Sequence, residues 1–195
     1  MPRFKGILAA AALAAGCASD PSPESDPAQA PAPVALALPA TYVNTPGCPG
    51  CLAVTITLRP DGSFLAREQL GSTDFHDLGR WRLAGETLEL AGGRDVRRYL
   101  LATLTRAPNV EPLRGPFRLV GQYDGVGFKE CRTGLRWEFS DNKLGAALKR
   151  QLEERDANPA MVALDAELQG APEKLRLIRP GTFLSARTCP AHLSR

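Results

Sequence analysis

The residues with the most distinctive chemistry in this sequence are five cysteines: Cys17, Cys48, Cys51, Cys131 and Cys189. A cysteine thiolate is a nucleophile and a ligand for soft metal ions, and two thiols can be oxidised to a disulfide. Which of these reactions a cysteine undergoes depends on its neighbours and on the compartment of the protein. The residues before Cys17 indicate that compartment.

The first 16 residues have the pattern of a signal peptide. Arg3 and Lys5 give a positive start, and residues 7–16 form an apolar run that is too short to span a bilayer, which takes about 20 apolar residues. The run ends in Leu13-Ala14-Ala15-Gly16-Cys17, small residues followed directly by cysteine. This pattern resembles a bacterial lipobox, so we expect residues 1–16 to be removed and Cys17 to carry lipid.

Two neighbours of Cys17 bear on this interpretation. Ala14 stands three places before the cysteine, where leucine is more usual, and an ordinary secretory signal with a chance cysteine is the alternative. Ala18 is not the aspartate that resembles an inner-membrane retention signal. We therefore expect the lipoprotein sorting machinery to place the chain in the outer membrane, facing the periplasm, with several acyl chains on Cys17 holding it there.

Residues 17–40 are expected to form a tether behind the lipid. They are mostly Pro, Ala, Ser and Asp, and such a segment buries too little apolar surface to offset the entropy of ordering it. Prolines make it semi-extended, so it would hold the folded part away from the membrane.

The charge of the mature chain argues against nucleic acid as a partner. Loss of Arg3 and Lys5 lowers the formal net charge from +3 to +1, which is too small for a nucleic-acid binder. The sequence also lacks a nucleophile–base pair, a paired-acid motif and a glycine-rich phosphate loop, so we expect no enzyme. His76 and His192 are isolated from each other, and Trp81 and Trp137 are expected in the core or at its rim.

The four cysteines after Cys17 are an even set, which in an exported protein implies disulfides. A bond between Cys131 and Cys189 closes a loop of about 59 residues and stabilises the fold by about 4 kcal/mol on the chain-entropy model, against about 2 kcal/mol for the ring of Cys48 and Cys51. The long bridge is therefore expected to be structural and the short one to be switchable.

The motif Cys48-Pro49-Gly50-Cys51 has four interpretations. A thioredoxin-like redox motif would need a βαβ context, whereas this one leads into a strand. A structural zinc site would need further Cys or His ligands nearby. A Cu(I) site needs two thiolates and little else, so copper stays open as a cofactor. The simplest interpretation is a small disulfide that holds the start of a strand.

Residues 41–106 are expected to form the first domain, a lipocalin-like antiparallel β-barrel. Val54, Ile56 and Leu58 alternate with polar residues, and Pro60-Asp61-Gly62-Ser63 has the chemistry of a hairpin turn. Further short strands follow at hairpin spacing, at 63–70, 75–83, 87–90 and 96–101, and a closed barrel removes the edges of such a meander.

Residues 115–195 are expected to form the second domain, an OB-fold barrel with one helix. Three strands are predicted before a helix, namely 117–123, a segment that contains Phe128, and 135–139. Strands 161–168 and 175–178 follow the helix, with 182–184 as a last short one. A helix capped by Ser140 or Asp141 and stopped by Asn158-Pro159 would bury Leu144, Leu148 and Leu152 on one face. The fold class is thus mainly all-β.

Several of these features together resemble the NlpE family of outer-membrane lipoproteins, also called CutF. They are Tyr42 ahead of the CxxC motif, the strand and turn from Thr55 to Gly62, and Gly79-Arg80-Trp81. In the second half the strand 117–123, Cys131 ahead of Thr133-Gly134, and Cys189 near the end are also similar. The family usually has Leu-Pro-Cys-Ala-Asp-Cys, so this chain lacks the acidic residue between the cysteines.

The resemblance implies a lipocalin-like barrel joined to an OB-fold, the pairing of Cys131 with Cys189, and a role as a sensor that reports envelope faults to the inner-membrane Cpx sensor kinase. We hypothesise a non-enzymatic signalling lipoprotein. The alternatives are copper handling by the thiolates of Cys48 and Cys51, and a carrier of a small apolar ligand. Val54, Ile56 and Leu58 would largely fill the first barrel, which argues against the carrier.

Overall fold

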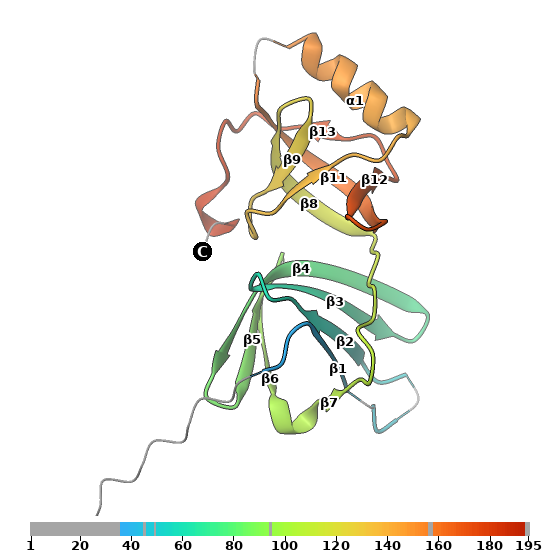
Figure 1. The fold of residues 1–195 in the computed structure, drawn as a ribbon, viewed down its shortest axis with the longest axis vertical. Helices are drawn as coiled ribbons and strands as arrows, with labels where there is room; N and C mark the ends of the chain where they lie inside the picture. The colour runs from blue at the N-terminus through green and yellow to red at the C-terminus, as the bar shows by residue number, and fades with distance from the viewer. Residues whose placement is uncertain (1–35, 45, 49, 94, 156–157, 194–195) are drawn as a thin grey trace, which may run out of the picture. The chain divides into compact units, whose positions relative to one another are not determined.

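The structure is a computed structural model that describes residues 36–44, 46–48, 50–93, 95–155 and 158–193. Two curled antiparallel β-sheets and one α-helix make up these residues, and both sheets lie in one compact unit (Figure 1). This confirms the mainly β fold class. Cys17, the signal peptide and most of the expected tether lie outside the described residues.

The first sheet has seven strands in an up-and-down order, β6-β5-β4-β3-β2-β1-β7. Their bounds are β1 Ala40–Val43, β2 Ala53–Leu58, β3 Ser63–Leu70, β4 Thr73–Ala84, β5 Thr87–Ala91, β6 Val96–Leu100 and β7 Thr105–Arg106. A 3-10 turn, Leu101–Thr103, links β6 to β7. The sheet curls like a barrel. Within the described part of the chain no ladder joins β6 to β7, so these two strands are its two ends.

Local residue chemistry explains how this sheet turns and curls. Asp61 accepts hydrogen bonds from Ser63 N at 2.8 Å and Ser63 Oγ at 2.6 Å, and Gly62 has a φ of 79°, which closes the β2–β3 hairpin. In β4, a Cβ at Gly79 would collide with the backbone of Ala91. Glycine at this position therefore permits a close approach that bends the sheet.

The interior of the first sheet is filled by its own side chains. Val54, Ile56 and Leu58 are at most 1% exposed, and they pack with other apolar residues of the sheet, among them Phe64, Leu88 and Leu90. These three residues thus fill the interior, as the sequence predicts.

The second sheet follows with β8 Phe117–Tyr123, β9 Gly127–Glu130, β10 Arg136–Glu138, β11 Ala160–Gln169, β12 Lys174–Leu177 and β13 Thr182–Phe183. Its order is β10-β9-β8-β11-β12, with β13 beside β11. A parallel bridge between Phe139 and Leu175 joins the end of β10 to β12. Five strands closed in this order, with a helix between the third and fourth, form the Greek-key barrel of an OB-fold.

The helix α1, Lys143–Glu153, begins later and ends earlier than expected. The N-cap is Asn142, whose side chain accepts a hydrogen bond from Gly145 N at 2.7 Å, so the expectation of Ser140 or Asp141 was wrong. Ser140 instead pairs with the carbonyl of Leu175, which extends the sheet past β10. The helix ends at Glu153, before Asn158-Pro159.

The apolar face of α1 is the expected one. Leu148 and Leu152 are buried in the core of the second sheet, and Leu144 packs against that core partly buried. Trp137 is also buried in this core, whereas Trp81 is half-buried in the first sheet and donates from Nε1 to the carbonyl of Arg59 at 3.1 Å.

The strands β1 and β7 of the first sheet were not predicted from the sequence. The strand β1 follows a segment without periodicity, and β7 precedes one. The fold also starts before residue 41, because Leu36 and Leu38 pack against the core of the first sheet and Ala40 is buried in it. The C-terminal end of the predicted tether, residues 17–40, therefore belongs to the folded part of the chain. The described residues contain no helix with the length and hydrophobicity of a membrane span.

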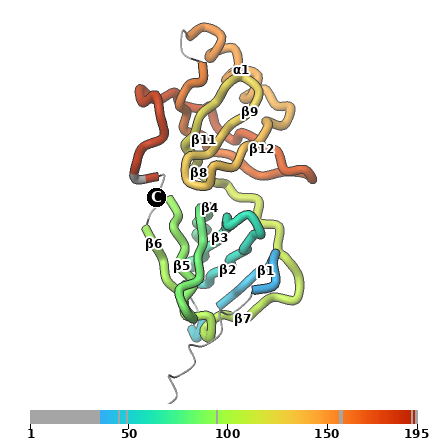
Figure 2. The backbone as a smooth tube through the Cα atoms, turned by 60° about the vertical axis from the view of Figure 1, so that its left-hand side comes forward, coloured from blue at the N-terminus to red at the C-terminus, as the bar shows by residue number. Residues whose placement is uncertain are grey.

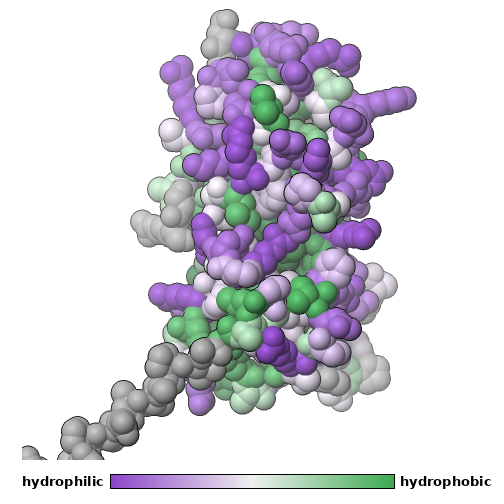
Figure 3. Space-filling view, in the orientation of Figure 1, coloured by the Kyte–Doolittle hydropathy of each residue, from purple (hydrophilic) through white to green (hydrophobic). Residues whose placement is uncertain are grey.

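The two sheets meet where β4 lies against β8 (Figures 1 and 2). Leu65 of β3 and Leu78 of β4 belong to the hydrophobic core of the second sheet, where Phe117 and Leu119 of β8 also lie. On the face shown in Figure 3, hydrophobic residues gather over the first sheet and hydrophilic ones predominate over the second. A division into two independently folding domains stays a prediction.

Candidate functional site

The cysteines are joined as two disulfides, Cys48–Cys51 and Cys131–Cys189, each with a Cα–Cα distance of 5.5 Å. They differ in environment. Cys48 and Cys51 are exposed, whereas Cys131 is only 8% exposed and Cys189 is half-buried. A reductant or a metal ion therefore reaches the short bridge far more easily than the long one.

The loop that carries Cys48 and Cys51 is held at its base by Asn44. Asn44 N donates to Val54 O at 3.1 Å, its Oδ1 accepts from Val54 N at 2.6 Å, and its Nδ2 donates to Leu52 O at 3.1 Å. These bonds fix the loop where it joins β1 and β2 independently of the disulfide. We therefore expect the strand pairing to persist when the Cys48–Cys51 bond is opened.

Cys131 lies in a turn that is organised by the buried carboxylate of Glu130. Glu130 is 0% exposed and accepts four hydrogen bonds: from Arg132 N at 2.9 Å, Arg132 Nε at 2.8 Å, Thr133 N at 2.8 Å and Thr133 Oγ1 at 2.9 Å. A buried carboxylate is stable only when it is paired in this way. The turn between β9 and β10 is therefore rigid, and Cys131 is placed in it.

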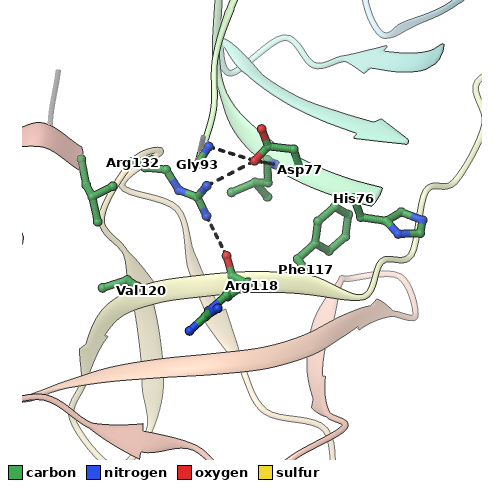
Figure 4. Close-up of a pocket in the computed structure, with 9 residues that line it drawn as sticks. His76, Asp77, Gly93, Phe117, Arg118, Val120 and Arg132 are labelled. Carbon is green, nitrogen blue, oxygen red and sulfur yellow. Dashed lines mark hydrogen bonds and ion pairs between the residues drawn. The ribbon is translucent and has the colours of Figure 1, made fainter. Parts of the chain in front are cut away.

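The guanidinium of Arg132 links this turn to the first sheet (Figure 4). Its Nη1 lies 3.3 Å from Asp77 Oδ1 on β4, and its Nη2 donates to the carbonyl of Arg118 on β8 at 3.0 Å. Asp77 also accepts from Gly93 N at 2.9 Å. The side chain of Arg132 is 8% exposed, so these contacts are largely removed from water.

Further charges extend the contact into the first sheet. Arg97 of β6 pairs with Asp77 and with Glu68 of β3, and the hydroxyl of Tyr99 lies 3.4 Å from Glu68. The network thus runs Glu68–Arg97–Asp77–Arg132–Glu130, with alternating charge from β3 to the turn of Cys131. We call it the inter-sheet charge network.

A cleft of about 450 Å³ lies beside this network, lined on the first sheet by His76, Asp77, Leu78 and Gly93, and on the second by Phe117, Arg118, Val120, Arg132 and Leu193. His76 contacts Phe117 edge to face, with 5.8 Å between ring centroids. Burial lowers the pKa of His76 below its ordinary value, which Asp74 partly offsets. Leu193 belongs to a short turn, Ala191–Leu193, just after Cys189, so the long disulfide also fixes one wall of the cleft.

This arrangement holds the two sheets together. The carboxylates of Glu130 and Asp77 are occupied by arginines and backbone amides, which leaves neither free to act as a general base. No group of three or more His, Cys, Asp and Glu side chains suited to a metal occurs among the described residues. Cu(I) binding by Cys48 and Cys51, which form a disulfide in this structure, stays a prediction that requires their reduction. The side chain of His192 lies outside the described residues.

Sequence reasoning missed every member of the inter-sheet charge network. Asp77 and Arg132 are 55 residues apart in the chain, and neither lies in a motif that marks it. The one available signal was the run Glu130-Cys131-Arg132-Thr133, in which two opposite charges flank a cysteine expected to be bonded.

No family model matches the chain, and no curated protein matches it. Among solved structures, the chain is similar to the Cpx pathway activator NlpE from Escherichia coli, with 17% sequence identity and a TM-score of 0.36 over 77% of this chain and 98% of that one. NlpE is the family whose motifs the sequence resembles.

Proposed function

We propose that this protein is an envelope lipoprotein, anchored in the outer membrane through Cys17, that acts as a non-enzymatic sensor of envelope stress and signals to an inner-membrane kinase of the Cpx type. The signal-peptide pattern and the lipobox support the anchor. Two disulfides among the described residues fit an oxidising compartment.

One observation carries the sensing role: the bond from Cys131 to Cys189 lies beside the residues that join the two sheets. Glu130 and Arg132 flank Cys131, and Arg132 reaches Asp77 across the contact. When the long disulfide is absent, the C-terminal segment and Leu193 lose their covalent attachment to the turn. The turn then depends on the hydrogen bonds of Glu130 alone, and we expect the contact between the sheets to loosen.

A loosened contact is a suitable signal because it alters which surfaces the protein presents, without chemistry on a substrate. The tether would allow those surfaces to reach a partner when the lipoprotein is mislocalised or misassembled. Loss of the Cys131–Cys189 disulfide would thereby change how the protein binds its partner.

The test is an envelope-stress transcription reporter in the host, with variants matched for expression. Cys131→Ser with Cys189→Ser should raise the reporter, and Arg132→Met, which leaves both disulfides in place, should raise it as well. Cys48→Ser with Cys51→Ser is the control and should not, because Asn44 holds that loop without its disulfide. A reporter that responds to none of these variants, nor to overexpression of the whole protein, would remove the sensor role.

Copper binding by Cys48 and Cys51 is the second candidate. It is favoured by the exposure of both cysteines and by a loop base that does not depend on their disulfide. Anaerobic Cu(I) titration of the reduced mature chain should give one tightly bound Cu(I), lost in Cys48→Ser. Full oxidation of all four cysteines in protein isolated without reductant, and no uptake after reduction, would exclude it.

A further inference from the structure

The strand β6 is the last strand at one end of the first sheet (Figure 2). It pairs with β5 in antiparallel register, Ala91 opposite Val96 and Thr87 opposite Leu100, and with no other strand in the part of the chain that the structure describes. A strand edge of this kind is a template for another strand unless it is covered or blocked.

The register shows which backbone groups of β6 face outward. Leu101 N donates to Glu86 O at 2.9 Å, so Leu101 bonds toward the β5 side. Such pairs alternate along an antiparallel ladder, so Tyr99 and Arg97 also bond toward β5. The backbone groups of Val96, Arg98 and Leu100 therefore point away from the sheet. Thr103 Oγ1 covers one of them, the carbonyl of Leu100, at 2.7 Å.

The same three residues also place their side chains on the outer face. Val96 is 51% exposed and Leu100 is 56% exposed. Next to Val96 is a mainly apolar groove of about 340 Å³, lined by Arg80, Trp81, Arg82, Glu89, Ala91 and Val96. An added strand would thus find both backbone partners and a hydrophobic recess for its side chains.

The charges beside this edge define the partner. Arg82 of β4, Glu89 of β5 and Arg98 of β6 stand in one cross-strand row. Arg98 Nε donates to Glu89 at 2.7 Å and Arg82 pairs with the same carboxylate, yet their side chains are 63% and 76% exposed. The hydrogen bonds from Arg98 and Arg82 lower the pKa of Glu89, which keeps it ionised. Two arginines share one carboxylate, and Arg80 adds a third cation at the groove.

We propose that the β6 edge binds an extended segment of a partner protein as an added antiparallel strand, in which an acidic residue stands two places from an apolar one so that both lie on the outer face. The acidic side chain would lie opposite Arg98, and the apolar one would lie opposite Val96 and enter the groove beside it. The surface stands whether or not the protein is a stress sensor, because neither disulfide contributes to it.

A second copy of the chain is a poorer occupant. Antiparallel pairing of two β6 strands about Arg98 places Arg98 opposite Arg98, and like charges in directly opposed positions destabilise a sheet. A membrane is also a poorer fit, because the clusters that bind anionic lipids carry more cations than this one.

The experiment uses the mature chain, residues 17–195, with Cys17→Ser so that no lipid is attached. The probe is a fluorescein-labelled peptide of about eight residues whose even positions are Val and Glu in turn and whose odd positions are Thr, so that valine and glutamate share one face of the strand. Its binding is followed by fluorescence anisotropy, and amide hydrogen exchange locates the site. We expect slower exchange at the amides of Val96, Arg98 and Leu100, and at least about tenfold weaker binding of a peptide with Lys in place of the acids.

Val96→Pro is the decisive variant. It removes an outward N–H and leaves the β5–β6 ladder intact, because Arg97 and Tyr99 carry the bonds to β5. We expect it to weaken binding by at least about tenfold. Val110→Pro, at an apolar residue of similar exposure (46%) in a loop, is the control and should bind as the parent does.

Three results would overturn the proposal. They are equal binding of the acidic and basic peptides, a concentration-dependent dimer that Val96→Pro abolishes, and sedimentation with phosphatidylglycerol vesicles that Val96→Pro removes while peptide binding is absent. The second would make another copy the occupant, and the third a lipid surface. None of them bears on the reporter response of the disulfide variants, so failure here is separable from failure of the sensor role.

Discussion

Replacing Arg132 by methionine tests the inter-sheet charge network most directly. Methionine keeps an unbranched apolar stem of similar reach and removes the guanidinium. Three side-chain contacts are lost: the hydrogen bond to Glu130 at 2.8 Å, the ion pair with Asp77 at 3.3 Å and the hydrogen bond to the carbonyl of Arg118 at 3.0 Å. The side chain is 8% exposed, so water replaces these contacts poorly.

The expected loss in the free energy of unfolding depends on the contacts that Glu130 and Asp77 keep after the substitution. Removing one partner of a buried ion pair costs about 3–5 kcal/mol. Glu130 keeps three hydrogen bonds, from Arg132 N, Thr133 N and Thr133 Oγ1, and Asp77 keeps Arg97. The loss should therefore lie at the lower end, about 3 kcal/mol in the free energy of unfolding, or about 6–12 °C in Tm for a fold of this size.

The control is Arg136→Met. Arg136 pairs with Asp124 at 2.7 Å, but their side chains are 50% and 37% exposed, so the change should cost about 0–1 kcal/mol. Urea unfolding followed by tryptophan fluorescence measures both variants, and a cycle with Asp77→Asn isolates the coupling to Arg132, expected at about 0.5–3 kcal/mol. If Arg132→Met costs no more than Arg136→Met, or the cycle shows no coupling, the network does not join the sheets.

Three further outcomes are expected from the same unfolding measurements. Cys131→Ser with Cys189→Ser should lower the free energy of unfolding by about 4 kcal/mol, measured against the parent without reductant; a loss below about 1 kcal/mol would contradict the structural role of the bond. His76 has a lowered folded-state pKa, so the unfolded chain binds its proton first and stability should fall as pH drops below about 6.5; His76→Gln should flatten that slope, and an unchanged slope would refute it. Asp124, whose pKa is lowered to about 2 chiefly by the backbone N–H of Gly127, contributes stability that is present above its unfolded pKa of about 4 and is lost as pH falls toward 2. Asp124→Asn should cost about 1 kcal/mol at pH 7 and nothing near pH 2, and a cost that is independent of pH would count against the carboxylate.

The strands were predictable from the sequence where local patterns specify them. Val54, Ile56 and Leu58 alternate with polar residues, and Asp61-Gly62 supplies the turn chemistry, so β2, β3 and their hairpin needed no tertiary information. The order of the second sheet could also be anticipated, because one helix between the third and fourth strands is typical of an OB-fold.

The missed features depend on contacts between distant parts of the chain. The strand β7 has two residues and exists because Tyr42 and Val43 of β1 pair with it. Asn142 caps the helix because Ser140 is already committed to Leu175. In the same way, Asp77 and Arg132 acquire a role only when β4 lies against β8, so no periodicity or motif could have marked them.

The contribution of Leu65 and Leu78 to the core of the second sheet has a consequence for how this chain can vary. The loop from residue 107 to residue 116 separates two sheets in sequence, yet the apolar core does not divide there. A chimera cut in this loop would pair Phe117 and Leu119 with a foreign β3 and β4, leaving a cavity or a clash unless residues like Leu65 and Leu78 came with them. The second half is thus an OB-fold in topology, but Leu65 and Leu78 of the first sheet form part of its core. Substitutions on one side of this shared core therefore require matching substitutions on the other.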